Sequence, residues 1–182
     1  MRSLGRKLLC LTVAGVVAAS LAAYAHDTPE PLVPLGSFSS LRQDSEHCNG
    51  YSVELWRFGA SLRGLFRACA GLAGDIRTGI IGTGSHDQTS GAISFEANLS
   101  LGMDYLKGGV ETPSKDHFSF IGTLAGDALT GKLARTDEVY PNRKPHVESV
   151  RLKRRREKLP SYSSHLEWQR EAEKVMHNPA AK

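Results

Sequence analysis

Two pairs of neighbouring residues combine a carboxylate with an imidazole, the groups best suited to acid–base catalysis or metal binding. They are His86 with Asp87, and Asp116 with His117. Such pairs can activate water for hydrolysis or share a metal ion. Each pair lies at the end of an expected strand, where polar dipeptides usually form turns and neighbouring side chains point to opposite faces. We therefore predict no metal site and no cofactor. A hydrolase of an envelope polymer, with His117 and either Asp116 or Glu111 as its catalytic groups, stays as an alternative function.

A run of basic residues follows the last expected strand and is the second group with a chemical use. Its guanidinium and ammonium groups suit the phosphates of an anionic lipid or of lipopolysaccharide. The run has no interleaved aromatic residues on which bases would stack, so we do not expect nucleic acid as a partner. A solvated linker is the other interpretation. The candidate anion-binding residues are Lys153, Arg154, Arg155, Arg156 and Lys158.

The first 25 residues have the features of a secretory signal. Three basic residues precede an apolar run, and the sequence Ala-Tyr-Ala, which suits a signal peptidase, ends at Ala25. We expect residues 1–25 to be cleaved near Ala25 and the mature protein to be periplasmic or secreted; an uncleaved N-terminal anchor is the alternative. Cys10 lies in the segment that we expect to be removed, so Cys48 and Cys69 are the two cysteines expected in the mature chain. In an oxidising compartment we expect these two to form a disulfide and not to stay as free thiols.

The segment between these two cysteines has the pattern of a β-hairpin. Apolar and polar side chains alternate on both sides of a turn that we centre on residues 58–59. This turn places Cys48 opposite Cys69 and Glu54 opposite Arg63, and it keeps one face of the hairpin apolar. Directly opposed Cα atoms lie about 4.5 to 5.5 Å apart, within reach of a disulfide. The expected register and the expected disulfide therefore support each other.

A second hairpin is expected further along the chain. Gly126 and Asp127 fit a two-residue turn with glycine first, and this turn places Gly122 opposite Gly131. The gap that paired glycines leave on a sheet face indicates either a sharp bend of the sheet or an aromatic side chain from elsewhere that covers the backbone, and we favour the bend. Polar residues at 87–91 predict another turn. Further strands are expected at 35–41, at 76–84 with a bulge near Gly79 or Gly82, at 93–101 and at 146–153.

Alternating strands and tight turns predict an all-β fold. We expect an antiparallel meander that forms a small barrel or a two-sheet sandwich, with a short C-terminal amphipathic helix. The barrel is favoured because glycine is frequent in the strands and suits a tightly coiled sheet. After the signal, we expect an extended N-terminal spacer over 26–45, the β domain over 46–153, and a basic linker with the C-terminal helix over 154–182.

The C-terminal segment differs in charge from the body of the protein. Residues 26–142 carry a net charge of −5, and residues 143–182 a net charge of +6. The apolar stripe of the helix is narrow, so we expect an appendage whose deletion over 157–182 shifts the melting temperature by only a few degrees. Where the stripe packs, we expect it to cap a barrel mouth; a partner-binding helix is the alternative. The stripe consists of Trp168, Ala172, Val175 and Met176.

Two families share features with this chain. In strand number and export it is similar to lipocalin-type barrels, although the early Gly-x-Trp of that family is absent around Trp56. Residues 90–93 (Ser-Gly-Ala-Ile) resemble the Ser-Gly-x-x-Tyr loop of periplasmic lysozyme inhibitors, with Ile93 at the tyrosine position. We carry no residue role over from either family.

The sequence favours an exported binding or envelope-associated module. Its expected partner is an unknown protein or a small apolar ligand, or an anionic envelope surface that the basic tail would contact. The alternatives are a hydrolase, an inhibitor-like protein that binds a partner enzyme, and an envelope-stabilising protein with no ligand.

Overall fold

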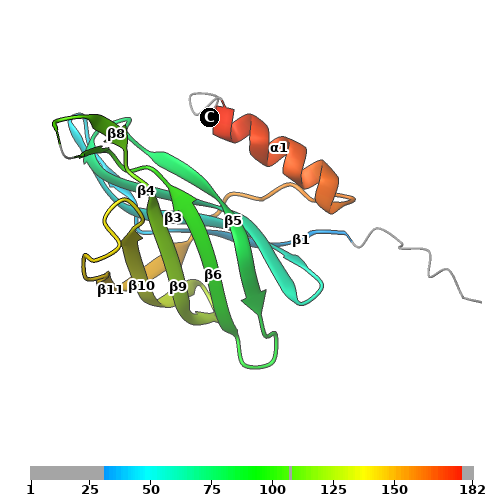
Figure 1. Cartoon of the computed structure of the whole chain (residues 1–182). Helices are drawn as coiled ribbons and strands as arrows, with labels where there is room; N and C mark the ends of the chain where they lie inside the picture. Colours follow the sequence, from blue (N-terminus) through cyan, green and yellow to red (C-terminus); the bar gives the residue numbers. More distant parts are fainter. Residues whose placement is uncertain (1–30, 107, 178–182) are drawn as a thin grey trace, which may run out of the picture.

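The structure, a computed structural model, describes residues 31–106 and 108–177; the expected signal over 1–25 and Cys10 lie outside the described residues. Strands dominate, and one helix lies near the C-terminal end (Figure 1). The elements are β1 (Val33–Ser39), β2 (Arg42–Gln43), β3 (His47–Phe58), β4 (Ser61–Leu72), β5 (Arg77–His86), β6 (Ala92–Leu99), β7 (Met103–Tyr105), β8 (Glu111–Pro113), β9 (Asp116–Ala125), β10 (Ala128–Asp137), β11 (His146–Arg154) and α1 (His165–His177).

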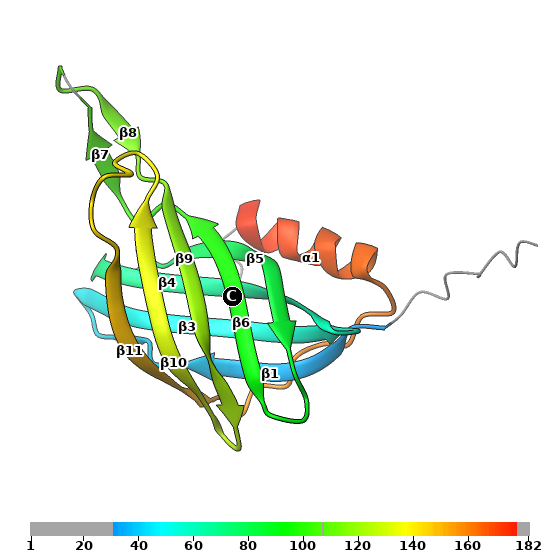
Figure 2. The ribbon, with the colours of Figure 1, turned by 60° about the horizontal axis from the view of Figure 1, so that its bottom comes forward.

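Eight antiparallel strands close into a barrel, which confirms the predicted all-β class. Strands β3, β4, β5, β6, β9, β10 and β11 are neighbours in chain order, and β1 pairs with both β11 and β3 to close the ring. Strand β1 confirms the short strand expected at 35–41, and it corrects the spacer expected over 26–45, because part of that segment is a wall strand that closes the barrel. Strands β7 and β8 form a separate ribbon that projects beyond one end of the barrel (Figure 2).

The first hairpin forms as predicted, but its register differs by two residues. Its turn is Gly59–Ala60 and not 58–59, because the first residue of this two-residue turn has a φ of 59°, which glycine adopts without strain. A shift of two keeps every side chain on its expected face. It also makes Cys48 and Cys69 diagonal neighbours, with Cα atoms 5.7 Å apart. Glu54 accordingly bonds Arg67 at 2.7 Å and not Arg63.

The second hairpin has the predicted register. Gly122 lies opposite Gly131, and the turn is Gly126–Asp127. The gap on the sheet face is filled by the ring of Phe120, whose Cζ would lie 2.6 Å from a Cβ at position 122. Of the two explanations for the paired glycines, the aromatic cover is therefore observed, although the ring comes from the same strand and not from elsewhere. The predicted bulge in β5 occurs at Gly82, between Ile81 and Thr83.

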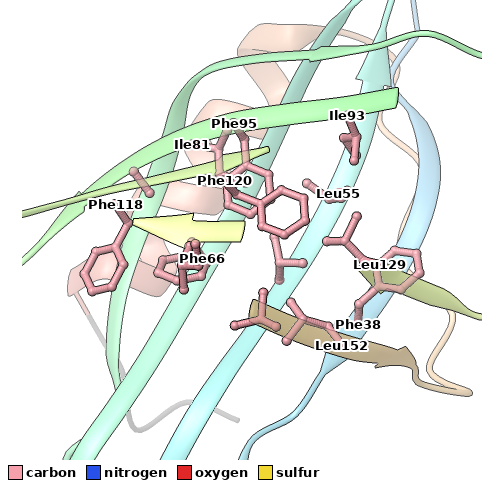
Figure 3. Packing of buried hydrophobic residues seen from close by; sticks show 14 of the residues in the cluster. Phe38, Leu55, Phe66, Ile81, Ile93, Phe95, Phe118, Phe120, Leu129 and Leu152 are labelled. Carbon is pink, nitrogen blue, oxygen red and sulfur yellow. The ribbon is translucent and has the colours of Figure 1, made fainter. Parts of the chain in front are cut away.

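Large apolar side chains fill the interior of the barrel (Figure 3). The rings of Phe95 and Phe120 stack with centroids 4.9 Å apart, and those of Phe66 and Phe118 lie 5.1 Å apart. The interior is thus packed with side chains from all around the barrel wall. The labelled interior residues are Phe38, Leu55, Phe66, Ile81, Ile93, Phe95, Phe118, Phe120, Leu129 and Leu152.

The disulfide closes a loop of 21 residues at one end of the first hairpin. In the chain-entropy account, such a loop stabilises a protein by about 3 kcal/mol. We expect the double variant Cys48→Ser/Cys69→Ser to unfold at a temperature roughly 6 to 12 °C lower than the oxidised protein, as measured by calorimetry. Reduced wild-type protein is the control and should match the variant. Equal melting temperatures for oxidised and reduced protein would contradict this role.

Helix α1 packs on the outer face of β3, β4 and β5, and not over a barrel mouth (Figure 2). Trp168 and Ala172 of the predicted apolar stripe are buried there against Trp56 and Leu65. The strand residues point outward because they alternate with the interior side chains of the same strands. The protein thus has a second apolar core outside the barrel.

The segment before α1 is also held in place. Trp56 Nε1 donates a hydrogen bond to the carbonyl oxygen of Pro160 at 2.9 Å. The backbone of Leu32 bonds that of Tyr162 at 3.1 Å, and Ser164 Oγ accepts from the N–H of Glu167 as a helix cap. These contacts join the C-terminal segment to the start of β1.

His165 links the start of α1 to the barrel. Its Nε2 accepts a hydrogen bond from Arg63 Nε at 3.0 Å, and its ring stacks on Trp168. Burial and the charge of Arg63 lower the pKa of His165 below its ordinary value of 6.5. The unfolded chain therefore binds this proton first as the pH falls.

We expect the contribution of His165 to stability to be complete above about pH 6.5 and to be lost as the pH falls through the lowered pKa. The matched variant is His165→Gln, which cannot titrate. Urea midpoints measured from pH 8 to pH 5 should fall more steeply for the wild type than for the variant. If the urea midpoints of the two proteins fell equally with pH, the titration of His165 would not contribute to the pH dependence of stability.

Candidate functional site

Asp116 and His117, the first predicted acid–base pair, are separated by the alternation of β9. Asp116 is 1% exposed, and its carboxylate accepts hydrogen bonds from Arg135 and Ser114, each at 2.7 Å, and from the N–H of Leu101 at 3.0 Å. His117 points to the other face, where its Nδ1 lies 2.7 Å from Asn98 Oδ1. The hydrogen bonds of Asp116 therefore connect the ends of neighbouring strands. Asp116 and His117 do not form an acid–base pair in the structure.

His86 and Asp87, the second pair, lie at the end of β5. The Asp87 carboxylate accepts hydrogen bonds from Ser90 Oγ and the N–H of Thr89, which together lower the pKa of Asp87. The predicted turn over 87–91 is thereby confirmed, with Gly91 at a φ of 72°. Among the described residues, no group of three or more His, Cys, Asp or Glu side chains is placed to hold a metal ion.

The predicted basic run belongs partly to β11, and the strand alternation divides it. Arg154 turns back over the Phe38 ring, 4.6 Å from its centroid, and donates a hydrogen bond to the Leu35 carbonyl at 2.7 Å. Lys153 and Arg155, one residue to either side, point outward. Arg154 therefore helps to close one end of the barrel, while its two neighbours face solvent.

These outward residues line a hollow, which we call the basic groove, of about 410 Å³ where β11 meets the chain after β1. Arg42, at the start of β2, enters it from one side, and Arg151, two residues before Lys153, from the other. Two serines also line the groove, but their hydroxyl groups donate hydrogen bonds to the Tyr51 carbonyl, at 3.4 and 3.5 Å. The lining residues are Ser39, Ser40, Leu41, Arg42, Arg151, Lys153, Arg154 and Arg155.

The groove exists because the barrel wall is incomplete at this point. Strand β1 pairs with only the last two residues of β11, at Phe38 with Arg154 and Ser39 with Lys153, and then leaves the wall. We call the opening between 40–42 and 147–151 the seam. A second hollow of about 310 Å³ continues along the seam beside Tyr51 and Glu148.

Tyr51 and Glu148 form the floor of the seam. Tyr51 Oη donates a hydrogen bond of 2.6 Å to Glu148 Oε1, which joins β3 to β11 across the opening. Burial and this hydrogen bond raise the pKa of Tyr51, so the phenol keeps its proton. The Glu148 carboxylate is therefore engaged with Tyr51 at the floor of the seam.

The cations of the groove are largely free to bind an anion. Within residues 31–106 and 108–177, Arg42, Arg151 and Lys153 have no carboxylate within ion-pair distance. Arg155 pairs with Glu157 at 3.0 Å, but both side chains are about half exposed and such pairs contribute little. Like charges held together without partners raise the local affinity for anions.

Three of the five predicted basic residues line the groove, and two do not. Arg156 and Lys158 follow β11, are exposed and are not among the lining residues. Sequence reasoning missed Arg42 and Arg151. The alternation of side chains along a strand places Arg151 on the same face as Lys153 and Arg155, so this residue could have been predicted. Arg42 reaches the groove only because the barrel closes.

No protein-family model, no curated protein and no solved structure matches this chain. Among the described residues, no helix has the length and apolar character needed to cross a membrane.

Proposed function

We propose that this protein is an exported, non-catalytic binding module that recognises an anionic partner at the basic groove. The observation that carries this proposal is the convergence of Arg42, Arg151 and Lys153, from two separate parts of the chain, on one hollow without carboxylate partners. A basic run on a flexible linker would need no such convergence. The export signal predicted over 1–25 supports a periplasmic or secreted location.

The shape of the site favours a narrow anionic group over a flat surface. Guanidinium and ammonium groups line the groove together, an arrangement suited to carboxylate or phosphate oxygens. An anionic envelope surface remains a candidate partner, provided that its headgroups enter the groove. The hydrolase alternative has less support, because Asp116 is buried among its own hydrogen-bond partners and points away from His117.

The test is equilibrium binding of the mature protein to two probes, poly-L-glutamate and vesicles that contain phosphatidylglycerol. Arg42→Ala/Arg151→Ala removes two groove cations. Because a basic residue near an anionic surface contributes about 1 kcal/mol, we expect the double variant to bind roughly ten- to thirtyfold more weakly at low salt. Binding of the wild type should fall as salt rises, since exposed charges are screened.

The matched control is Lys144→Ala/Arg170→Ala, which removes two exposed cations outside the groove. It should bind both probes nearly as well as the wild type. Equal losses in the two double variants would mean that net charge, and not the groove, determines binding. Absence of binding to either probe would contradict the proposed function.

A further inference from the structure

One edge of β11 is unpaired along the seam. Arg154 donates its N–H to the Asp127 carbonyl on the β10 side, and Arg155 donates its N–H to the Ser37 carbonyl on the β1 side. Because these directions alternate along a strand, the backbone groups of odd-numbered residues in β11 face the seam. Strand β1 satisfies only the end of that edge.

The unpaired groups are those of Val147, Ser149 and Arg151. Within the described part of the chain, their N–H groups have no hydrogen-bond partner. The facing edge of β3 differs, because Ser40 donates to the Tyr51 carbonyl at 2.8 Å and Arg42 pairs with Asn49. The seam thus has one covered side and one open side, and the two hollows described above lie along it.

We propose that an extended acidic segment of a partner protein adds to β11 as a strand in the seam. This inference rests on the proposed function and specifies the anionic partner as an acidic peptide segment in an extended conformation. Strand addition uses the unpaired edge for backbone hydrogen bonds and the neighbouring side chains for specificity. The added strand runs antiparallel to β11, in the direction of β1, and continues the line that β1 leaves at Ser39.

The side chains of the seam determine the pattern of the added strand. Outward-facing Arg151 and Lys153 would lie beside its outward side chains, which favours Glu or Asp there as cross-strand ion pairs. Inward side chains would lie above Tyr51 and Val150, which favours apolar residues. The segment that fits therefore alternates acidic and apolar residues.

The same charges disfavour a second copy of this chain as the occupant. Two β11 edges that paired with each other would bring Arg151 and Lys153 close to their own equivalents, and like charges opposite each other destabilise a sheet. Basic residues on an edge also serve simply to prevent aggregation. That interpretation predicts no strand addition by any peptide, so experiment separates the two.

The probe is a ten-residue peptide of alternating Glu and Val, in three forms. The first is unmodified, the second is N-methylated on its Glu residues, and the third is N-methylated on its Val residues. In the antiparallel arrangement the outward Glu residues exchange hydrogen bonds with Val147, Ser149 and Arg151, whereas the Val amides face away. All three peptides carry the same charge.

We expect the Glu-methylated peptide to bind the wild type at least tenfold more weakly than the other two forms. Hydrogen exchange at the amides of Val147, Ser149 and Arg151 should slow at least tenfold when the unmodified peptide binds. Equal affinity of the three peptides, or loss with the Val-methylated form alone, would overturn the proposal. If no peptide binds while anionic vesicles bind in a manner sensitive to Arg42→Ala/Arg151→Ala, strand addition is wrong and the proposed function stands.

Discussion

Trp168→Ala is expected to lower the free energy of unfolding by about 3 to 5 kcal/mol, the cost of truncating a large buried aromatic side chain. Trp168 is 2% exposed and packs against Trp56, with ring centroids 6.2 Å apart. Urea unfolding, followed by circular dichroism, measures this loss. Deletion of 157–182 should cost at least as much, because it exposes Trp56, Leu32 and Leu65 together. This replaces the shift of a few degrees that the narrow stripe predicted.

The matched control is Leu166→Ala on the same helix. Leu166 is an exposed residue, so its truncation should change stability by no more than about 0.5 kcal/mol. If Trp168→Ala were as mild as Leu166→Ala, the helix would be an appendage after all. The second core would then contribute little to the fold.

Asp116→Ala is expected to lower the free energy of unfolding by about 3 to 4 kcal/mol. The substitution removes three hydrogen bonds and leaves Arg135 without its buried counterion. The cost comes mainly from Ser114 and the N–H of Leu101, which would lose their acceptor, whereas the Arg135 side chain is 41% exposed and regains water. The same urea measurement applies.

An exposed ion pair provides the comparison for Asp116. Asp75 pairs with Arg77 at the surface, so Asp75→Ala should cost less than about 1 kcal/mol. Asp116→Ala should also leave binding to poly-L-glutamate unchanged, since Asp116 is not in the groove. If the Asp116→Ala protein were as stable as the wild type but bound poly-L-glutamate differently, Asp116 would have a role in binding and not in stability.

The barrel was predictable because local patterns determine most of it. Strict alternation defines β6 and β9, and the Gly126–Asp127 turn fixes the register of β9 with β10. The first hairpin shows the limit of this reasoning. A shift of two residues preserves the polarity of both faces, so only the φ of Gly59 distinguishes the two registers.

Helix docking and the groove were not predictable in this way. Trp56 lies in a strand whose other face fills the barrel, and nothing local indicates that Trp168 covers it. Arg42 joins Arg151 because β1 closes the barrel and then leaves its wall, which is a property of the whole sheet. Contacts between distant segments depend on how the whole barrel closes. The alternation of apolar and polar residues within one strand does not determine that closure.

The central claim is that the basic groove binds an anionic partner, and backbone amide chemical-shift mapping tests it most directly. The mature protein is titrated with poly-L-glutamate at low salt. We predict that the largest shifts lie at 39–42 and 147–155, on the two sides of the seam, and that high salt reverses them. Shifts centred on 86–94 at the other turns, or on the exposed face of α1, with none at the seam, would contradict the account.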